Sequence, residues 1–472
     1  MELTRFKIML EGPPPLNELG AIEFSLYGNP QVIEAVRVIN ERYLYWAEAK
    51  RRPLPNGVAP EAAWGLAKLF RVARLNKLSV ANLPGATFSW LVTDSTNAIL
   101  HQLDMEMGGK LGSNQLLADS EGEKQRYLLL SSQMEEAIAS SQLEGAATTR
   151  VHAKEMLRKK RPARDRSEQM IVNNYATIQF VLQHKHDALT PELLCEIQRQ
   201  MTQHTMDDEA DSGRFRQNDE VRVVNYVTGE VVHIPPPMVD LPQWLQAFCD
   251  LANEKVTLAG FMHPIVRASI LHFLLGYIHP FVDGNGRTAR AIFYWYLLRK
   301  NYWQIEYLSI SRIIHRASAQ YSRAFLYTEL DGNDLTYFIN YQVRTLQQAF
   351  DSLQQHLQRK LEERKQLQPV RRNAGLNDRQ LHIVQDLVGE PLAELTIREI
   401  QRRFNTAYAT ARADLISLEE LGLLTPAKIG KQKLLYFRAE DFDQKLRALQ
   451  SKPQLKNESR NSPNQQLELD VL

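Results

Sequence analysis

The stretch His279–Arg290, which reads HPFVDGNGRTAR, follows directly on an apolar run, RASILHFLLGYI. Its glycines and its asparagine favour turn conformations and therefore end a helix. The next residues, RTARAIFYWYLLRK, then begin a second helix. The predicted order is a helix, a glycine-bearing turn and a helix N-terminus. Because the first N–H groups of a helix lack internal partners and carry partial positive charge, this order predicts a phosphate site.

The polar side chains of this stretch suit the same ligand. Arg287 and Arg290 are three residues apart, so they share one helix face, and arginine binds phosphate oxygens with paired donors. Asp283 precedes the turn and suits Mg²⁺, which usually takes one or two protein carboxylates. Asn285 can donate to a phosphate oxygen. His279, at the end of the apolar helix, titrates near neutrality and can act as a general base toward a hydroxyl.

These residues resemble the signature of the Fic family, H-x-F-x-(D/E)-G-N-G-R-x-x-R, at every fixed position. Members of this family are helical enzymes that mostly transfer AMP from ATP to a hydroxyl of a target protein. The resemblance implies that His279 takes the proton from a Ser, Thr or Tyr hydroxyl, that Phe281 anchors the loop in the core and that Asp283 holds Mg²⁺. It further implies that Gly284, Asn285 and Gly286 form the cradle for the α- and β-phosphates, that Arg287 binds the β-phosphate and that Arg290 binds the γ-phosphate. Tyr321 and the loop near Asp331 lie where relatives often contact the base.

A second motif, SSQLEG, covers Ser140–Gly145. Glu144 falls in the last turn of a predicted helix, where a carboxylate opposes the helix dipole by about 0.3–1 kcal/mol. In isolation such a glutamate is usually solvated. The string nevertheless resembles the Fic inhibitory motif, (S/T)-x-x-x-E-(G/N), through Ser140, Glu144 and Gly145. The resemblance implies that Glu144 pairs with Arg290, so that ATP binds in a pose unfit for in-line attack.

The pattern along the chain predicts a mainly α fold with two or three domains. We expect a Fic-type helical bundle with a β-hairpin flap, followed by a winged helix domain. The expected parts are an N-terminal helical extension (1–118), a Fic catalytic domain (119–345) with its inhibitory helix at about 122–145, a connector helix (346–369), a winged helix-turn-helix domain (370–447) and a disordered tail (448–472).

Two hairpins are expected. Valine-rich alternation broken by TGE predicts one at about 220–234, and it is the only good strand pair expected in the first 360 residues. The family resemblance implies that this hairpin is a flap that lays the target segment beside the site by strand addition. The second hairpin, LTPAKIGKQKLLYF, follows three short helices, and that order is typical of a winged helix-turn-helix.

The C-terminal region has basic residues that suit phosphate contacts, although as a whole it is not strongly basic. They are Arg398, Arg402, Arg403 and Arg412 near the expected recognition helix, and Lys428, Lys431 and Lys433 on the wing. Binding to DNA, binding to a partner protein and dimerisation remain open for this domain.

The composition is typical of a globular protein and argues against several other classes. Hydrophobic residues make up 44% and charged residues 24%, which is ordinary for a globular protein, and the net charge of +2 offers no bulk attraction for nucleic acid. The two cysteines, Cys195 and Cys249, are too few for a disulfide framework and give no zinc spacing. No signal-peptide core and no membrane-length apolar run is found, so a cytoplasmic protein with no membrane partner is expected.

The leading functional hypothesis is a protein adenylyltransferase that uses ATP as substrate and Mg²⁺ as cofactor, and that Glu144 inhibits. The target is a protein hydroxyl, with self-modification and a homodimer left open. One alternative is an enzyme in which Glu144 positions water and removes AMP from a modified target. Another is a regulator that senses nucleotide and binds DNA, although nucleotide binding alone does not need His279.

Overall fold

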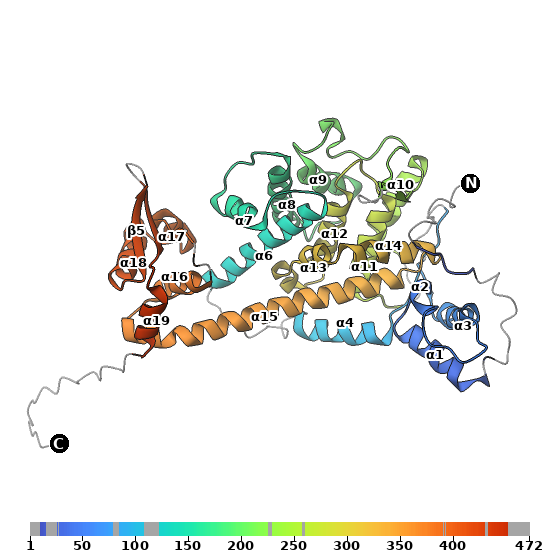
Figure 1. The fold of residues 1–472 in the computed structure, drawn as a ribbon. Helices are drawn as coiled ribbons and strands as arrows, with labels where there is room; N and C mark the ends of the chain where they lie inside the picture. The colour runs from blue at the N-terminus through green and yellow to red at the C-terminus, as the bar shows by residue number, and fades with distance from the viewer. Residues whose placement is uncertain are drawn as a thin grey trace, which may run out of the picture. The chain divides into compact units, whose positions relative to one another are not determined.

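The computed structural model describes residues 10–15, 26, 28–78, 85–107, 122–224, 229–256, 260–389, 391, 393–429 and 433–451 of the chain (Figure 1). The chain divides into two compact units, Met1–Gln354 and Gln355–Leu472. The described residues are mainly helical, which confirms the predicted fold class. Among them no helix is long and apolar enough to cross a bilayer.

The first unit contains most of the helices and two short strand pairs. Its elements are α1 (Pro30–Glu41), α2 (Trp46–Ala49), α3 (Pro60–Val72), β1 (Asn76–Lys77), β2 (Ser89–Trp90), α4 (Asp94–Met107), α6 (Gly122–Leu143), α7 (Arg150–Lys159), α8 (Arg166–Gln183), α9 (Pro191–Thr202), η4 (Glu209–Asp211), β3 (Val223–Val224), β4 (Val231–His233), η5 (Met238–Asp240), α10 (Leu241–Ala252), α11 (Pro264–Ile278), α12 (Asn285–Arg299), η6 (Trp303–Tyr307), α13 (Ile310–Arg316), α14 (Ser318–Leu330) and the first part of α15 (Thr336–Ala374).

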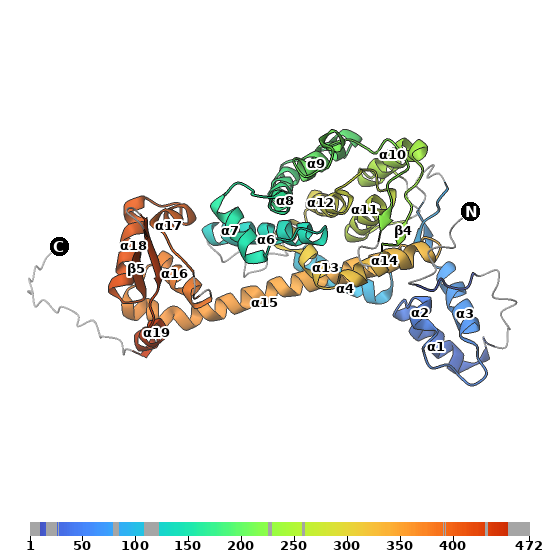
Figure 2. The ribbon, with the colours of Figure 1, turned by 45° about the horizontal axis from the view of Figure 1, so that its top comes forward.

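The centre of the first unit is the helix pair α11 and α12. Nearly every side chain of α11 is buried, because its sequence is apolar all round and such a helix has no face suited to water. Figure 2 shows the two helices side by side, with α6 and α8 on the side of α12 and α10 on the side of α11. The turn between α11 and α12 is the signature stretch, so the buried pair fixes the position of its polar groups.

The inhibitory helix expected at about 122–145 corresponds to α6, which ends at Leu143, so Glu144 lies just after the helix and not in its last turn. Gly145 stops it by adopting a left-handed backbone conformation, with φ +92°. Buried side chains on α6 face α8 and α13, among them Ile138 and Ser141. The last turn of α6 therefore has a fixed place beside α12.

The predicted flap hairpin is present as β3 and β4, which pair antiparallel with Val223 opposite His233 and Val224 opposite Val231. Residues 225–228 lie outside the described residues. A second pair, β1 with β2, was not expected. The prediction of a single strand pair was wrong because two-residue strands leave no alternation to detect.

The second unit contains the rest of α15, then α16 (Asp378–Gly389), α17 (Ile397–Arg403), α18 (Tyr408–Glu420), β5 (Leu424–Ile429), β6 (Lys433–Arg438) and α19 (Phe442–Ser451). Three helices precede a hairpin, in the order that the sequence predicted, and the winged helix assignment stays a prediction. The expected connector at 346–369 is part of the longer α15, and α19 was not expected. The domain boundary expected at residue 118 and the tail beyond Ser451 lie outside the described residues.

Candidate active site

The signature loop between α11 and α12 is held by contacts of its own residues with the core and with one another. Phe281 is fully buried, and its ring stacks on Phe215 with 5.1 Å between ring centroids. The Asn285 side chain accepts a hydrogen bond from the Phe281 N–H at 3.0 Å and donates one to the Phe281 carbonyl at 2.8 Å. One N–H of the Asn285 amide is thus used to hold the loop, and donation of its second N–H to a phosphate stays a prediction. The predicted anchoring role of Phe281 agrees with its burial.

Two glycines shape the first turn of α12. Gly284 precedes the helix with φ +84°, and a Cβ there would lie 2.8 Å from Thr202 Cγ2. Gly286 leaves room for another side chain, since a Cβ at this position would overlap the Glu144 carboxylate. A negatively charged group from α6 thus lies against the helix N-terminus, which is where the sequence predicts phosphate.

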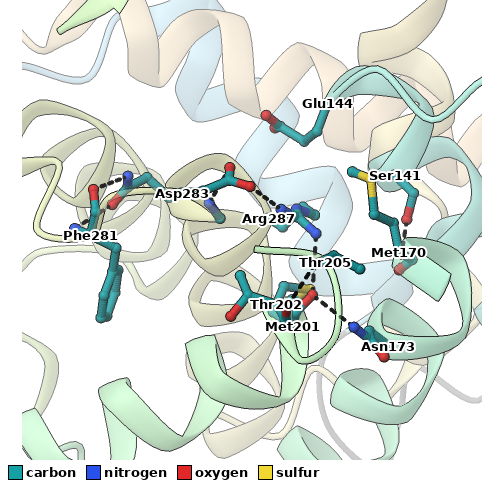
Figure 3. A network of polar contacts seen from close by, with 12 residues as sticks. Ser141, Glu144, Met170, Asn173, Met201, Thr202, Thr205, Phe281, Asp283 and Arg287 are labelled. Atoms are coloured by element: carbon teal, nitrogen blue, oxygen red, sulfur yellow. Dashed lines mark hydrogen bonds and ion pairs between the residues drawn. The ribbon is translucent and has the colours of Figure 1, made fainter. Parts of the chain in front are cut away.

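Arg287 is buried and only partly satisfied. Its Nη1 donates to the Met201 carbonyl at 3.2 Å and its Nη2 to Asp283 Oδ2 at 3.3 Å, as Figure 3 shows. Its Nε has no hydrogen-bond partner among the described residues, although the atom is buried. A buried donor without an acceptor costs about 1–3 kcal/mol, so a phosphate oxygen in reach of Arg287 would remove a penalty.

Arg290 is buried and held by the end of α6. Its Nε donates to Ser140 Oγ at 2.9 Å, and its Nη2 donates to the Ser140 carbonyl at 3.0 Å and to Glu144 Oε1 at 2.9 Å. Burial opposes the charge of Arg290, but Glu144, Tyr321 and Glu136 together outweigh burial and raise the pKa of this guanidinium. The pair that the resemblance implied is therefore present, and that it inhibits a reaction is a proposal.

His279 ends α11 in the left-handed backbone region, with φ +47°. Its Nδ1 lies 3.0 Å from the Gly276 carbonyl oxygen, which can only accept a hydrogen bond, so Nδ1 carries the proton. The neutral ring then has its lone pair on Nε2. Burial lowers the pKa of His279 to about 4; the hydrogen bond to Gly276 opposes this effect, whereas the charge of His233 adds to it. The ring is therefore a neutral base at physiological pH.

The pH dependence of AMP transfer and of folding stability tests this protonation state of His279. We expect the acid limb of kcat/KM to fall near pH 4, rather than near the ordinary histidine value of 6.5, because kcat/KM reports the free enzyme. The folded state binds fewer protons at His279 than the unfolded state between these values, so stability contributed by this group is lost as the pH falls from 6.5 toward 4. Rates of labelling with α-labelled ATP from pH 4 to 8, with folding followed by circular dichroism, measure both effects. An acid limb at 6.5 in folded protein would contradict the assignment.

Asp283 is a partly buried carboxylate at the rim of the loop. Its Oδ1 accepts from the Gly284 N–H at 2.5 Å, which leaves the carboxylate oriented by the turn. Figure 3 shows that it faces Arg287, while Phe281 points away into the core. Among the described residues no group of three or more His, Cys, Asp or Glu side chains is placed to hold a metal. A single carboxylate still fits Mg²⁺, whose remaining ligands usually come from water and substrate phosphates.

Tyr321 and Asp331, which mark the region expected near the adenine base of the nucleotide, lie in different surroundings. The Tyr321 hydroxyl lies 2.9 Å from His272 Nε2, and its ring packs among aromatic side chains beside Arg290. Asp331 is buried in an ion pair with Lys68 of α3 at 2.8 Å and accepts from the Tyr337 hydroxyl. The Asp331 side chain is therefore engaged within the fold, and contact of the base with Tyr321 and the loop near Asp331 stays a prediction.

Several groups that hold the site were not singled out from the sequence. Gln198 of α9 donates to the Asp283 carbonyl at 3.0 Å and accepts from the Gly213 N–H. Arg216 is buried, and its N–H and guanidinium bind the Pro280 and His279 carbonyls. Glu136 of α6 accepts hydrogen bonds from Ser309 and Ser311 at the start of α13. The only signal in the sequence was the string GRFRQ, which contains Arg216 but does not show its partners.

Comparison with known proteins points to the same residues. The model of the Fic/DOC family matches residues 188–297, which run from just before α9 through most of α12. The protein adenylyltransferase Fic of Drosophila willistoni is 35% identical over 114 residues, which are 24% of this chain and 20% of that protein. The same-named protein of Culex quinquefasciatus is 37% identical over 125 residues, which are 26% of this chain and 23% of that protein. The chain thus matches only about a quarter or less of the length of these relatives.

Among solved structures, a crystal structure of a Fic family protein from Desulfovibrio desulfuricans G20 is similar, with a TM-score of 0.48 and 18% sequence identity. The match covers 74% of this chain and 97% of that one. The family match spans the helices that present His279 and Arg290, and the signature loop joins those helices as described above. The chain therefore carries a Fic domain of the Fic/DOC family.

Proposed function

We propose that this chain transfers AMP from ATP to a hydroxyl group of a protein, and that the end of α6 restrains the transfer. One observation carries the proposal: His279 has its Nδ1 bound to the Gly276 carbonyl, which leaves the lone pair on Nε2, and the helix that follows its loop carries two buried arginines. The arginines and the helix N-terminus suit a polyphosphate, and the histidine suits the group that attacks it. The activity named for the relatives is the same.

In the proposed reaction, His279 Nε2 takes the proton of the target hydroxyl. The hydroxyl oxygen then forms a bond to the α-phosphorus, the bond from that phosphorus to the β-phosphate oxygen breaks, and pyrophosphate leaves. Arg287 and Arg290 would hold the β- and γ-phosphates, and backbone N–H groups at Gly286 would face the chain of phosphates. Asp283 would hold Mg²⁺, which when bound neutralises phosphate charge. Strand pairing with β3 and β4 would lay the target segment near His279.

The position of the label in ATP tests the reaction type. We propose to incubate the Glu144→Gly variant with α-labelled or γ-labelled ATP and to separate the protein on a denaturing gel. AMP transfer predicts label on protein from the α position and none from the γ position. Protein-bound label from γ-labelled ATP would instead show phosphoryl transfer and would overturn the proposal. Asp283→Asn is the companion variant for the role of Mg²⁺.

Removal of AMP by Glu144 is the second candidate. The Glu144 side chain is 24% exposed, so water can reach a carboxylate that also lies against the phosphate cradle. This function predicts that wild-type chain releases labelled AMP from pre-labelled protein and that Glu144→Gly does not. Nucleotide sensing without transfer is less favoured, since a neutral histidine with a free Nε2 is not needed for binding alone.

For the second unit we propose contact with duplex DNA. Arg398 and Arg402 are exposed one turn apart on α17, and Arg412 is exposed on α18. Arg403 is not available for phosphate, because it forms an ion pair with Asp386 and its guanidinium lies over the Phe404 ring. Lys428 is exposed on β5, whereas Lys431 and the side chain of Lys433 lie outside the described residues.

The neighbouring arginines of α17 provide a matched test. Arg402→Ala should weaken binding and flatten the plot of log affinity against log salt by about one unit, because one phosphate contact is lost. Arg403→Ala should leave that slope unchanged, since its side chain is used within the unit. Gel shifts with random-sequence duplex between 50 and 200 mM salt measure the slope. Absence of any shift at low salt would favour a partner protein over DNA.

A further inference from the structure

His233, the last residue of β4, lies between two hydrogen-bond acceptors. Its Nδ1 is 2.8 Å from Glu329 Oε2 of α14, and its Nε2 is 2.7 Å from the Tyr277 carbonyl oxygen of α11. The ring is 7% exposed, so water does not substitute for either partner. Both contacts are short, and both partners can only accept while the glutamate is ionised.

The two acceptors fix the protonation state of the ring. A neutral imidazole has one N–H and one lone pair, so with two facing acceptors one contact would set a lone pair against an oxygen. An imidazolium donates from both nitrogens and satisfies both. The pKa of His233 agrees with this geometry: burial opposes the charge, but the hydrogen bond and charge of Glu329 and the hydrogen bond to Tyr277 together outweigh burial and raise the pKa above 6.5.

The position of His233 connects the flap to the catalytic helix. Tyr277 is in the last turn of α11, two residues before His279. The buried Arg216 also holds the base of the flap, because its guanidinium donates to the Asn218 carbonyl before β3 and to the Pro236 carbonyl after β4. Of these two attachments, the one through His233 depends on the charge of an imidazole.

We propose that His233 is a positioning residue, whose imidazolium joins the flap strand β4 to α11 and α14 and so fixes the flap beside His279. The effect on transfer rests on the function proposed above, whereas the attachment itself does not. With His233 neutral, β4 loses one hydrogen bond and an ion pair, and the target-binding edge is no longer held against the helix that presents the base. The charge of His233 also favours the neutral form of His279.

The groups around the His233 ring determine how the attachment of the flap changes with pH. Glu329 approaches from α14, the Tyr277 carbonyl and ring approach from α11, and the charge of His233 also acts on His279. Since the folded-state pKa of His233 is raised, the attachment is fully present below about 6.5 and is lost as the pH rises through that raised value. The flap is therefore held most firmly on the acid side of neutrality.

Ring ¹⁵N NMR of the full chain labelled at histidine tests the protonation state without any activity. At pH 7 we expect His233 to show two protonated ring nitrogens, and Glu329→Gln to abolish this state. His263, at the other end of α11, provides a reference: its Nε2 meets Asp104 at 2.9 Å, but its Nδ1 accepts from the Ile265 N–H, so one ring proton satisfies it. A single protonated nitrogen on His233 at pH 7 would overturn the proposal.

Two substitutions of His233 each keep one of its two hydrogen bonds and remove the other. His233→Asn places an amide near the Nδ1 position and keeps a donor to Glu329, whereas His233→Gln places one near Nε2 and keeps a donor to Tyr277. Each should speed amide hydrogen exchange in Val231–His233 by about 10- to 100-fold, because one charge-assisted hydrogen bond is lost. His263→Asn should leave that exchange unchanged. Unchanged exchange in both His233 variants would show that the flap does not depend on this residue.

The same variants in a Glu144→Gly background report on transfer. In the chain that keeps His233, self-labelling from α-labelled ATP should decline between pH 6.5 and 9. In the His233→Asn and His233→Gln chains this decline should be absent, and the affinity for ATP should be unchanged. A decline that persists in both variants would show that another group controls it. Absence of labelling in every chain, with the NMR and exchange results as expected, would count against the proposed function and not against the attachment.

Discussion

Replacing His279 with alanine should lower AMP transfer by about 10²–10⁴-fold, the usual contribution of a general base. The physical reason is that Nδ1 is tied to the Gly276 carbonyl, so Nε2 is the lone pair that the helix presents. The affinity for ATP should change little, because the buried arginines and the first turn of α12 do not depend on the imidazole. Label incorporation and nucleotide binding, both measured in the Glu144→Gly background, separate the two quantities.

A second variant controls for the backbone at this position. His279 has φ +47°, a conformation that costs alanine free energy but that asparagine adopts more readily. His279→Asn should therefore keep the loop and still lose transfer by a similar factor. Transfer at a near wild-type rate in either folded variant would rule out His279 as the base.

The chemistry of the signature loop could be predicted because it is local. The glycines, the carboxylate and the arginines occur within twelve residues that follow a buried helix, and local pattern shows where such a helix ends. What the pattern could not show was the use of each donor. The Asn285 amide can bind a phosphate or its own loop, and its two hydrogen bonds to the Phe281 backbone could not be foreseen from the pattern.

Contacts between residues far apart in the sequence could not be predicted from the local sequence pattern. His233 and Glu329 are 96 residues apart, and Lys68 and Asp331 are 263 apart. Each side chain taken alone is typical of a solvated surface residue, and burial gives it a partner that spacing does not reveal. Glu144 and Arg290, 146 residues apart, were matched only through the family resemblance, since nothing in the SSQLEG string identifies a particular arginine.

The Glu144→Gly variant should transfer AMP about 100-fold faster than the wild-type chain. In the wild type, the Ser140 carbonyl and hydroxyl and the Glu144 carboxylate together occupy the Nε and Nη2 groups of Arg290. A γ-phosphate would compete for the same guanidinium, and the Glu144 carboxylate also lies against Gly286 in the cradle. Removing this carboxylate frees both places, so the α-phosphorus can lie in line with the hydroxyl, and a misplacement of about 1 Å can cost 10²-fold.

The control for this effect is a glutamate within α6, the helix that Glu144 follows. Glu135 forms ion pairs with Arg150 and Lys154 of α7 and has no contact with Arg290 among the described residues. Glu135→Gly introduces the same substitution in α6, so it should reduce the stability of the helix without increasing transfer. Equal activation by both variants would indicate that loosening of α6, rather than release of Arg290, is the cause.

Combining Glu144→Gly with Arg290→Ala should return transfer to about the wild-type level or below. If Glu144 inhibits by occupying Arg290, activation requires the freed guanidinium, and a chain without it has no side chain of this kind to hold the γ-phosphate. If Glu144 instead inhibits only by filling the space over Gly286, its removal should activate the chain whether or not Arg290 is present. The four chains of this cycle, labelled with α-labelled ATP under identical conditions, give the coupling between the two residues directly. Additive effects would reject the competition for Arg290, whereas activation that vanishes with Arg290 would locate the restraint in this single ion pair.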